Sequence, residues 1–282
     1  METISLTLTD EQINKFYNVY KDFLVISKNQ YIKYSFKLES CVVNIYTSNK
    51  AVFQGQDAKI YSASFSYQQD FKAQAGSDEV GTGDFFGPII VVACIVDEIN
   101  YQKIKDLGIT DSKKITDNQI LKMAPKLMEL LPYTKLILSN KQYNEIIKDN
   151  NMNKIKARMH NQAYINLVKK GYKLPNSIII DQFATPDNYY NYLINEPQII
   201  KNITFKTKAE AKYIAVGAAS IIARYIFLNE MDKMNRQYNF DFHKGAGVIV
   251  DQRIQAFIEK YSRNELAKVG KLNFKNYKKL EG

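Results

Sequence analysis

The chain has 282 residues, and 45% of them are hydrophobic, which is enough to bury a core and excludes an intrinsically disordered protein. The net charge of +10, from 39 Lys and Arg against 29 Asp and Glu, indicates a polyanionic partner, nucleic acid first, although a codon bias toward lysine would produce the same excess. No run approaches the ~20 consecutive apolar residues of a membrane helix, so no membrane partner is expected.

The ends and cysteines of the chain indicate its compartment. Met1–Ser5 lacks the basic and then apolar segments of a secretory signal. The two cysteines, Cys41 and Cys94, are too few for a disulfide scaffold or a zinc site, and Cys94 lies in an apolar run that predicts a core position. These features predict a reduced, cytoplasmic setting.

Residues 1–72 are predicted to form a small α+β domain. Thr9 and Gln12 have the spacing of a capping box that opens a helix. Runs of β-branched and aromatic residues predict strands at Tyr31–Leu38, Cys41–Thr47 and Ala51–Gln56. The polar segment Ser62–Lys72 is typical of a linker. With 8 Lys against 7 acidic residues, this domain carries +1 and leaves +9 to residues 73–282.

Residues 73–282 alternate between strand and helix patterns, which predicts an α/β domain around a central sheet. Strands are expected at Ala75–Asp78, Ile89–Val96, Lys135–Leu138, Ser177–Asp181 and Ile199–Phe205. Helices are expected at Thr116–Leu131, Asn153–Lys169 and Ala209–Met234. The last helix contains a stretch of small residues, Ala215–Ala219, which suits close packing on a sheet.

Three acids stand where predicted strands end. Asp78 and Glu79 are neighbours, and neighbours on a strand point to opposite faces, so they share one site only if the chain bends at Gly81–Gly83. Asp181 ends a run of three isoleucines. Ligands collect at strand ends in open α/β sheets, which makes all three acids candidates for a site.

Two further acids have a structural explanation beside a functional one. Glu210 follows Thr207 by three residues, which is also the spacing of a capping box. Asp187 follows Thr185 and Pro186, a pattern that puts the acid in the first turn of a helix, where the helix dipole favours it. The residues alone leave open whether the acids converge or act separately.

Convergence of the acids would define the chemistry. Clustered carboxylates without histidine suit Mg²⁺ or Mn²⁺ and not zinc. Two such ions ~3.5–4 Å apart can activate a water and stabilise the leaving oxygen in phosphodiester hydrolysis. The basic charge of the chain would then hold a polyanionic substrate.

The segment from Gly76 to Pro88 closely resembles the opening active-site motif of ribonuclease HIII, within the type 2 ribonuclease H family. Its sequence is Gly-Ser-Asp-Glu-Val-Gly-Thr-Gly-Asp-Phe-Phe-Gly-Pro. Supporting segments follow in the order of the family at residues 110–114, 156–161, 181–184, 208–210, 218–224, 244–247 and 271–274. The resemblance covers about residues 74–280, and the first part of the chain matches less sharply.

The resemblance implies a ribonuclease H-like mixed sheet flanked by helices, preceded by a substrate-binding α+β domain in residues 1–72 that resembles half of a TATA-binding protein. It implies an endonuclease that cuts the RNA strand of RNA–DNA hybrids with two Mg²⁺ or Mn²⁺ ions, leaving 5′-phosphate and 3′-hydroxyl ends. The implied catalytic acids and metal ligands are Asp78, Glu79, Asp181 and Glu210. The chain is expected to act as a monomer.

One departure from the family concerns the fourth ligand. Relatives often carry another acid where this chain has Thr185, which favours Glu210 and leaves Asp187 as an alternative. His160 and Asn161 lie in a predicted helix and are left outside the site, because satisfied helix residues explain them equally well.

The remaining candidates are substrate contacts. The backbone of Gly81, Thr82 and Gly83 is expected to approach the 2′-hydroxyls that distinguish RNA from DNA, although a tight turn alone would also need glycines. Ser112 and Lys113 are expected to contact a phosphate, although they also suit a solvated loop. Two alternatives stay open: a ribonuclease HII-like repair enzyme that incises at single ribonucleotides, and a hybrid-binding protein without catalysis.

Overall fold

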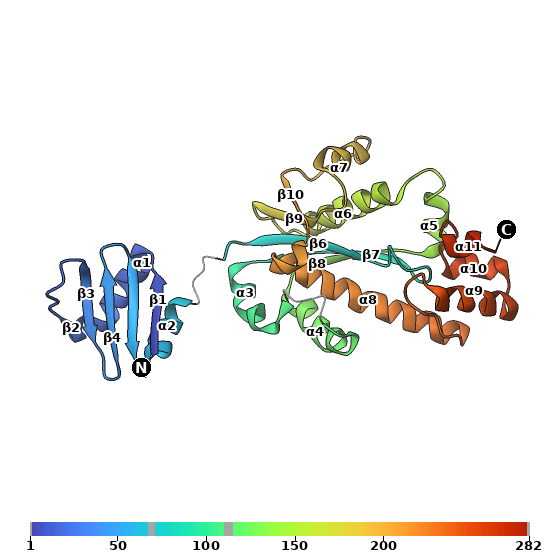
Figure 1. Cartoon of the computed structure of the whole chain (residues 1–282). Coiled ribbons are helices and arrows are strands. Elements are labelled where there is room, and N and C mark those ends of the chain that lie inside the picture. Colours follow the sequence, from blue (N-terminus) through green and yellow to red (C-terminus); the bar gives the residue numbers. More distant parts are fainter. Residues whose placement is uncertain (1, 67–70, 110–114, 281–282) are drawn as a thin grey trace. The chain divides into compact units, whose positions relative to one another are not determined.

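The computed structural model describes residues 2–66, 71–109 and 115–280 (Figure 1). The chain divides into two compact units, residues 1–71 and residues 72–282. The expected boundary after residue 72 lies one residue from this division. Both cysteines are buried and free.

The first unit is an antiparallel sheet with helices on one face. Its strands, in the order β1-β5-β4-β3-β2, are β1 (Glu2–Thr7), β2 (Leu24–Val25), β3 (Ile32–Lys37), β4 (Cys41–Tyr46) and β5 (Lys50–Gly55). Its helices are α1 (Asp10–Tyr20), a 3₁₀ turn (Lys21–Phe23) and α2 (Ala58–Ser66). The predicted capping box opens α1, since the Gln12 amide donates to Thr9 Oγ1 over 3.2 Å and the Thr9 amide donates to Gln12 Oε1 over 2.8 Å.

The core of the first unit explains one wrong prediction. Phe16 of α1 and Phe53 of β5 stack edge to face in this core, with ring centroids 6.2 Å apart. Tyr61 and Phe65, one helical turn apart, pack against the same core. The segment Ser62–Lys72 is therefore not a linker from its first residue, because α2 continues to Ser66.

The second unit is a mixed sheet flanked by helices, which confirms the predicted α/β class. Its strands, in the order β10-β9-β6-β7-β8, are β6 (Gln74–Val80), β7 (Ile89–Val96), β8 (Tyr133–Leu138), β9 (Ser177–Asp181) and β10 (Ile203–Lys206). Its helices are α3 (Glu98–Ile104), α4 (Asp117–Leu130), α5 (Asn140–Ile146), α6 (Met152–Lys169), α7 (Pro186–Tyr192), α8 (Ile214–Tyr238), α9 (Val248–Lys260), α10 (Arg263–Val269) and α11 (Lys275–Lys278). Short 3₁₀ turns lie at Lys105–Leu107 and Ala209–Ala211.

Helices α6 and α8 cover opposite faces of this sheet (Figure 1). On the α6 face, Ala75 of β6 and Tyr164 of α6 belong to one buried apolar cluster. On the α8 face, Gly76 packs so closely that a Cβ there would lie 2.4 Å from the backbone of Ala215, in the predicted small-residue stretch. The side chains of β6 therefore alternate between the two helices, which decides where its acids point.

Two predicted elements of this unit begin several residues later than predicted. The helix predicted from Ala209 begins at Ile214, because a separate 3₁₀ turn holds residues 209–211. The last strand begins at Ile203 and not at Ile199, since the Ile200 amide donates to the Asn161 side chain over 2.9 Å.

Helix α8 is long and apolar enough to cross a membrane, by length and composition only. However, 67% of its most apolar window is buried inside the protein. The core helix of a folded domain has the same properties, so this helix is weak evidence for a membrane span.

Candidate active site

The strand register brings Asp78 and Asp181 together. β6 and β9 are parallel, with Ser77 opposite Ile180, so one further step along both strands puts Asp78 beside Asp181. Both acids lie at the carboxyl ends of their strands. Their closeness has an electrostatic effect, because the charge of Asp181 contributes to a raised pKa at Asp78.

The Asp78 carboxylate lies on the α8 face of the sheet. It accepts hydrogen bonds from the Ser220 side chain and from the Glu79 amide, the latter over 2.8 Å. Burial raises the pKa of Asp78 to about 8, and the negative charges of Glu79 and Asp181 add to the shift. A positive charge bound at this carboxylate would therefore be strongly favoured.

Glu79 points to the other face, toward α6. It forms an ion pair with Lys156, and His160 Nε2 lies 2.9 Å from its Oε2. The other ring nitrogen of His160 lies 2.7 Å from Ser77 Oγ. Burial opposes ionisation of Glu79, but the bonds and charges of His160 and Lys156 outweigh it and hold its pKa at about 2.

The partners of Glu79 are residues that the sequence analysis did not place in the site. Lys156 and His160 are four residues apart on α6, so they lie on one face of the helix. Phe183 closes this group, since the Lys156 ammonium lies 4.0 Å from its ring centre and the His160 ring stacks on it at 5.4 Å. The spacing of a basic residue and a histidine within the 156–161 segment was the available signal. Asn161 binds backbone groups near Ile200 and stays outside the site.

Glu210 lies in the 3₁₀ turn packed between β9 and α8, and it is only 5% exposed. The amide of the preceding residue, Ala209, donates to Asp181 Oδ1 over 2.9 Å, so the turn is tied to the strand end. The capping box with Thr207, the alternative explanation of Glu210, does not match the start of the turn, because its N-cap position is Lys208, with φ 55° and no side-chain cap hydrogen bond.

Asp187 has the structural role that its pattern predicts. Thr185 is the N-cap of α7, and its Oγ1 accepts a hydrogen bond from the Asn188 amide over 3.4 Å. Asp187 is exposed in the first turn. The helix dipole favours an acid at this position.

The glycine turn follows β6 directly. Gly81 has φ +89°, and a Cβ there would lie 2.1 Å from the Pro88 carbonyl oxygen, so only glycine closes the turn. Gly83 is different: it is exposed, and a Cβ there would meet nothing within 4 Å. Thr82 between them is partly exposed. The backbone at Gly83 is therefore open to a ligand.

A basic group lies at the start of α4, which follows in the sequence the segment that was expected to contact phosphate. Ser112 and Lys113 themselves lie outside the described residues. Next to that segment, Asp117 at the start of α4 pairs with both Arg224 of α8 and Lys244. The carboxylate of one acid thus holds two cations together on a partly exposed surface.

The comparisons with known proteins agree with this geometry. The family description "Ribonuclease HII" matches residues 75–277, and "Domain of unknown function (DUF3378)" matches residues 3–77. The chain is 38% identical to a ribonuclease HIII of Streptococcus pneumoniae over 289 residues, covering 100% of this chain and 98% of the relative. The chain belongs to the ribonuclease HII family.

Within this family, relatives that match over the full length include ribonucleases HIII, which confirms the resemblance. A ribonuclease HIII of Streptococcus mutans is 36% identical over 296 residues, covering 99% of this chain and 97% of the relative. The solved structure of Bst-RNase HIII in complex with Mn²⁺ is 33% identical, with a TM-score of 0.72, and the match covers 99% of this chain and 97% of that chain. Because these matches span both units, the repair-type ribonuclease HII alternative is not favoured.

The acids fit a hard cation by their chemistry. Among the residues that the structure describes, no group of three or more His, Cys, Asp or Glu side chains is arranged to hold a metal ion. Asp78 and Asp181 nevertheless offer only carboxylate oxygens, the donors that Mg²⁺ and Mn²⁺ prefer. The repulsion that contributes to the raised pKa of Asp78 is the repulsion that a cation would relieve.

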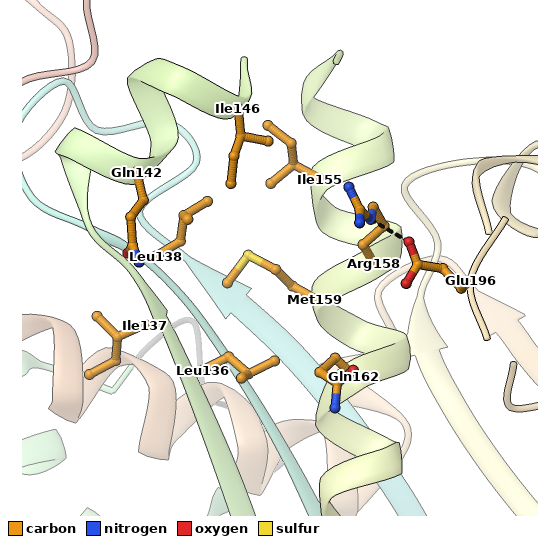
Figure 2. Close-up of a pocket in the computed structure, with 10 residues that line it drawn as sticks. All are labelled: Leu136, Ile137, Leu138, Gln142, Ile146, Ile155, Arg158, Met159, Gln162 and Glu196. Carbon is orange, nitrogen blue, oxygen red and sulfur yellow. Dashed lines mark ion pairs between the residues drawn. The ribbon is translucent and has the colours of Figure 1, made fainter. Parts of the chain in front are cut away.

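A separate hollow of about 330 Å³ lies between β8, α5 and α6 (Figure 2). Its lining is mostly apolar, with Leu136, Leu138 and Met159 pointing into it. Its charged groups, Arg158 and Glu196, are paired with each other over 2.6 Å. The lining thus offers no acid that is free of a cationic partner, and the candidate catalytic groups of this family member lie elsewhere, at the ends of β6 and β9.

Proposed function

We propose that the chain is an endoribonuclease that hydrolyses the RNA strand of RNA–DNA hybrids. The observation that carries this proposal is the parallel register of β6 and β9, which sets Asp78 and Asp181 side by side next to the open glycine turn. Membership of the ribonuclease HII family, with full-length ribonuclease HIII relatives, supports the same substrate.

Asp78 and Asp181 would hold the cofactor, Mg²⁺ or Mn²⁺, with Glu210 as a further ligand. Glu79, the remaining expected ligand, would have to exchange Lys156 and His160 for the cation, because these two groups bind its carboxylate on the α6 face. When bound, the divalent cation supplies Lewis acidity at the scissile phosphate and reduces the cost of negative charge in the transition state. Hydrolysis leaves 5′-phosphate and 3′-hydroxyl ends. Ser220 and the Ala209 amide orient the two central carboxylates, and Lys156 and His160 fix Glu79.

The glycine turn, Gly81–Gly83, recognises RNA through its backbone. The exposed backbone at Gly83 can donate and accept hydrogen bonds with successive 2′-hydroxyls, which DNA lacks. Ser112 and Lys113, which lie outside the described residues, are proposed to contact a backbone phosphate of the same substrate. The enzyme acts as a monomer in the cytoplasm and has no membrane partner.

Cleavage should depend on the number of ribonucleotides. Thr82 between the two glycines is uncharged, so it cannot form a charged contact that would bind a single RNA–DNA junction strongly. We expect efficient cutting in a run of four or more ribonucleotides. At a lone ribonucleotide in duplex DNA the rate should be at least about a hundredfold lower, since several bonds of ~1 kcal/mol are lost and ~1.4 kcal/mol is tenfold.

Duplexes with one, two, four or all ribonucleotides in a labelled strand measure this dependence, with Mg²⁺, Mn²⁺ or a chelator. The all-DNA duplex is the control and should not be cut. Equal rates on the single-ribonucleotide and all-RNA strands under Mg²⁺ would instead assign a repair-type activity. No cleavage of any strand with either metal would leave a hybrid-binding protein.

The first unit supplies binding and not chemistry, because it contains none of the proposed ligands. Lys37 and Lys50 lie on the sheet face away from α1 and α2, since their neighbours Phe36 and Ala51 point into the core. Thr3, Val42 and Gln54, which share a register row with Lys37, are also exposed. This face combines cations with polar side chains and an exposed valine, and its lysines suit a nucleic-acid surface.

A chain that begins at Lys72 should therefore keep its kcat within about threefold while KM for the hybrid rises by about tenfold or more, because a linked second binding module adds avidity. Lys37→Ala with Lys50→Ala in the full chain should reproduce part of this rise. Lys59→Ala is the matched control, since Lys59 is an exposed lysine of α2. Steady-state kinetics on one hybrid compares the full chain, the shortened chain and the two lysine variants. An unchanged KM without residues 1–71 would show that the first unit does not bind the substrate.

A further inference from the structure

Lys271 is a buried lysine that the proposed chemistry does not use. Its side chain is 0% exposed. Its ammonium donates one hydrogen bond to the Asp84 carbonyl oxygen over 2.7 Å and another to the Gly87 carbonyl oxygen over 2.6 Å. Both carbonyls belong to the turn that runs from Gly81 to Pro88. The C-terminal part of the chain therefore reaches into the turn that follows the catalytic strand.

The Lys271 ammonium supplies hydrogen-bond donors to two carbonyl oxygens of the turn. The carbonyls of Asp84 and Gly87 point inward, and a buried carbonyl without a donor is costly. Burial lowers the pKa of Lys271 to about 7, which shows how little water reaches this group. An amine that loses a proton still has two N–H groups, so both bonds can persist in either protonation state.

The backbone around Lys271 is paired with the same turn. The Lys271 amide donates to the Phe85 carbonyl over 3.0 Å, and the Gly87 amide donates to the Val269 carbonyl over 3.1 Å. Between these bonds, Gly270 forms an isolated β-bridge with Phe86. A Cβ on Gly270 would lie 2.5 Å from the Phe85 ring, so the two segments pack as closely as their backbones allow.

Helix α5 holds the C-terminal segment from its other side. The Asn144 amide group donates to the carbonyls of Ala267 and Gly270 over 3.0 and 2.9 Å. Its side-chain oxygen accepts a hydrogen bond from the Leu272 amide over 3.0 Å. The position of Lys271 is therefore held by α5 as well as by the turn that it supports.

We propose that Lys271 is a positioning residue that places the Gly81–Gly83 backbone for contact with the RNA strand. The inference rests on the proposed function, in which this backbone reads 2′-hydroxyls. It adds that the turn is held in place by a C-terminal segment, residues 269–272, which carries no catalytic acid. Loss of the two ammonium bonds should then weaken recognition of the hybrid more than it slows the chemical step.

Lys271→Met tests the proposal, because methionine has nearly the shape of lysine but no donor. We expect KM for an all-RNA hybrid to rise about tenfold, equivalent to ~1.4 kcal/mol, with kcat within about threefold. Preference for the hybrid over a competing DNA duplex should fall by a similar factor. Partial unfolding alone would lower the apparent kcat at unchanged KM, so the split between the two constants separates positioning from stability.

Lys268→Met is the matched control, since Lys268 lies three residues away. Its side chain is 57% exposed and pairs with Glu265 at the surface, so the substitution should leave both constants unchanged. If Lys271→Met does not fold, Asn144→Ala provides the same test, because it removes the bonds that hold residues 267–272 and should also raise KM. An unchanged KM and an unchanged hybrid preference in the folded variant would overturn the proposal. A wild-type chain that fails to cut the hybrid would refute the proposed function instead.

Discussion

Asp78→Asn should abolish cleavage of the hybrid while leaving hybrid binding intact or tighter. The amide removes a charged ligand at the centre of the acid pair, and it also removes repulsion of the phosphates. Because a divalent cation contributes several kcal/mol and ~1.4 kcal/mol is tenfold, we expect kcat to fall by more than about a thousandfold. Single-turnover cleavage and anisotropy titration of a labelled hybrid measure the two effects.

The same substitution should stabilise the metal-free protein at neutral pH. The pKa of Asp78 in the folded protein is about 8, above its ordinary value of 3.8. The free energy of unfolding therefore falls as the pH rises between these values, because the carboxyl ionises more readily in the unfolded chain than in the folded protein. Asparagine removes that cost, and thermal unfolding with a chelator should give a higher Tm for the variant at pH 7. Below pH 3.8 this electrostatic difference should vanish, because the carboxyl is protonated in both states.

Metal addition gives a complementary measurement. Mg²⁺ or Mn²⁺ should raise the Tm of the wild type, since a ligand that binds only the folded state stabilises it, and should raise that of Asp78→Asn much less. Asp232→Asn is the control, because Asp232 is exposed on α8 and pairs with Arg236. Near-normal turnover of Asp78→Asn at saturating Mg²⁺ would contradict the assignment of this ligand.

Much of the site was predictable from local pattern because its strands are strongly apolar. Ile89–Val96 and Ser177–Asp181 are both strands with the predicted bounds. The adjacency of Asp78 and Asp181 was not predictable from spacing, since it depends on a parallel register between segments about a hundred residues apart. The family resemblance supplied that pairing.

The opposite orientation of Asp78 and Glu79 follows from simple strand alternation. Strand alternation alone does not say which residues bind Glu79 on the other face. Lys156 and His160 do so from α6, and their charge and hydrogen bonds are tertiary features that no local pattern contains. The support from Lys271 is hidden for the same reason, because a lysine in a short C-terminal segment is usually exposed.

Glu210→Gln should reduce kcat by about a hundredfold, because each lost ~1.4 kcal/mol of transition-state stabilisation is tenfold. Glu210 is 5% exposed, and its turn is tied to Asp181 through the Ala209 amide. A capping role does not account for it: Lys208 and Tyr213 occupy the N-cap positions of the turn and of α8, and neither caps with its side chain. Glutamine keeps the shape and removes the charge that a cation needs.

Asp187→Asn is the matched control for Glu210→Gln, since both remove one carboxylate charge near the end of β9. Asp187 is exposed in the capped first turn of α7, so its substitution should cost at most a few tenths of a kcal/mol of stability, as for an exposed acid beside a helix dipole. Its kcat should stay within about twofold of wild type. Measuring kcat for both variants with Mg²⁺ and Mn²⁺, beside their Tm values, decides between the two acids. If Glu210→Gln were folded and fully active while Asp187→Asn were inactive, the fourth ligand would be Asp187 of α7. This exposed acid would then have to move toward Asp181 to bind the same cation.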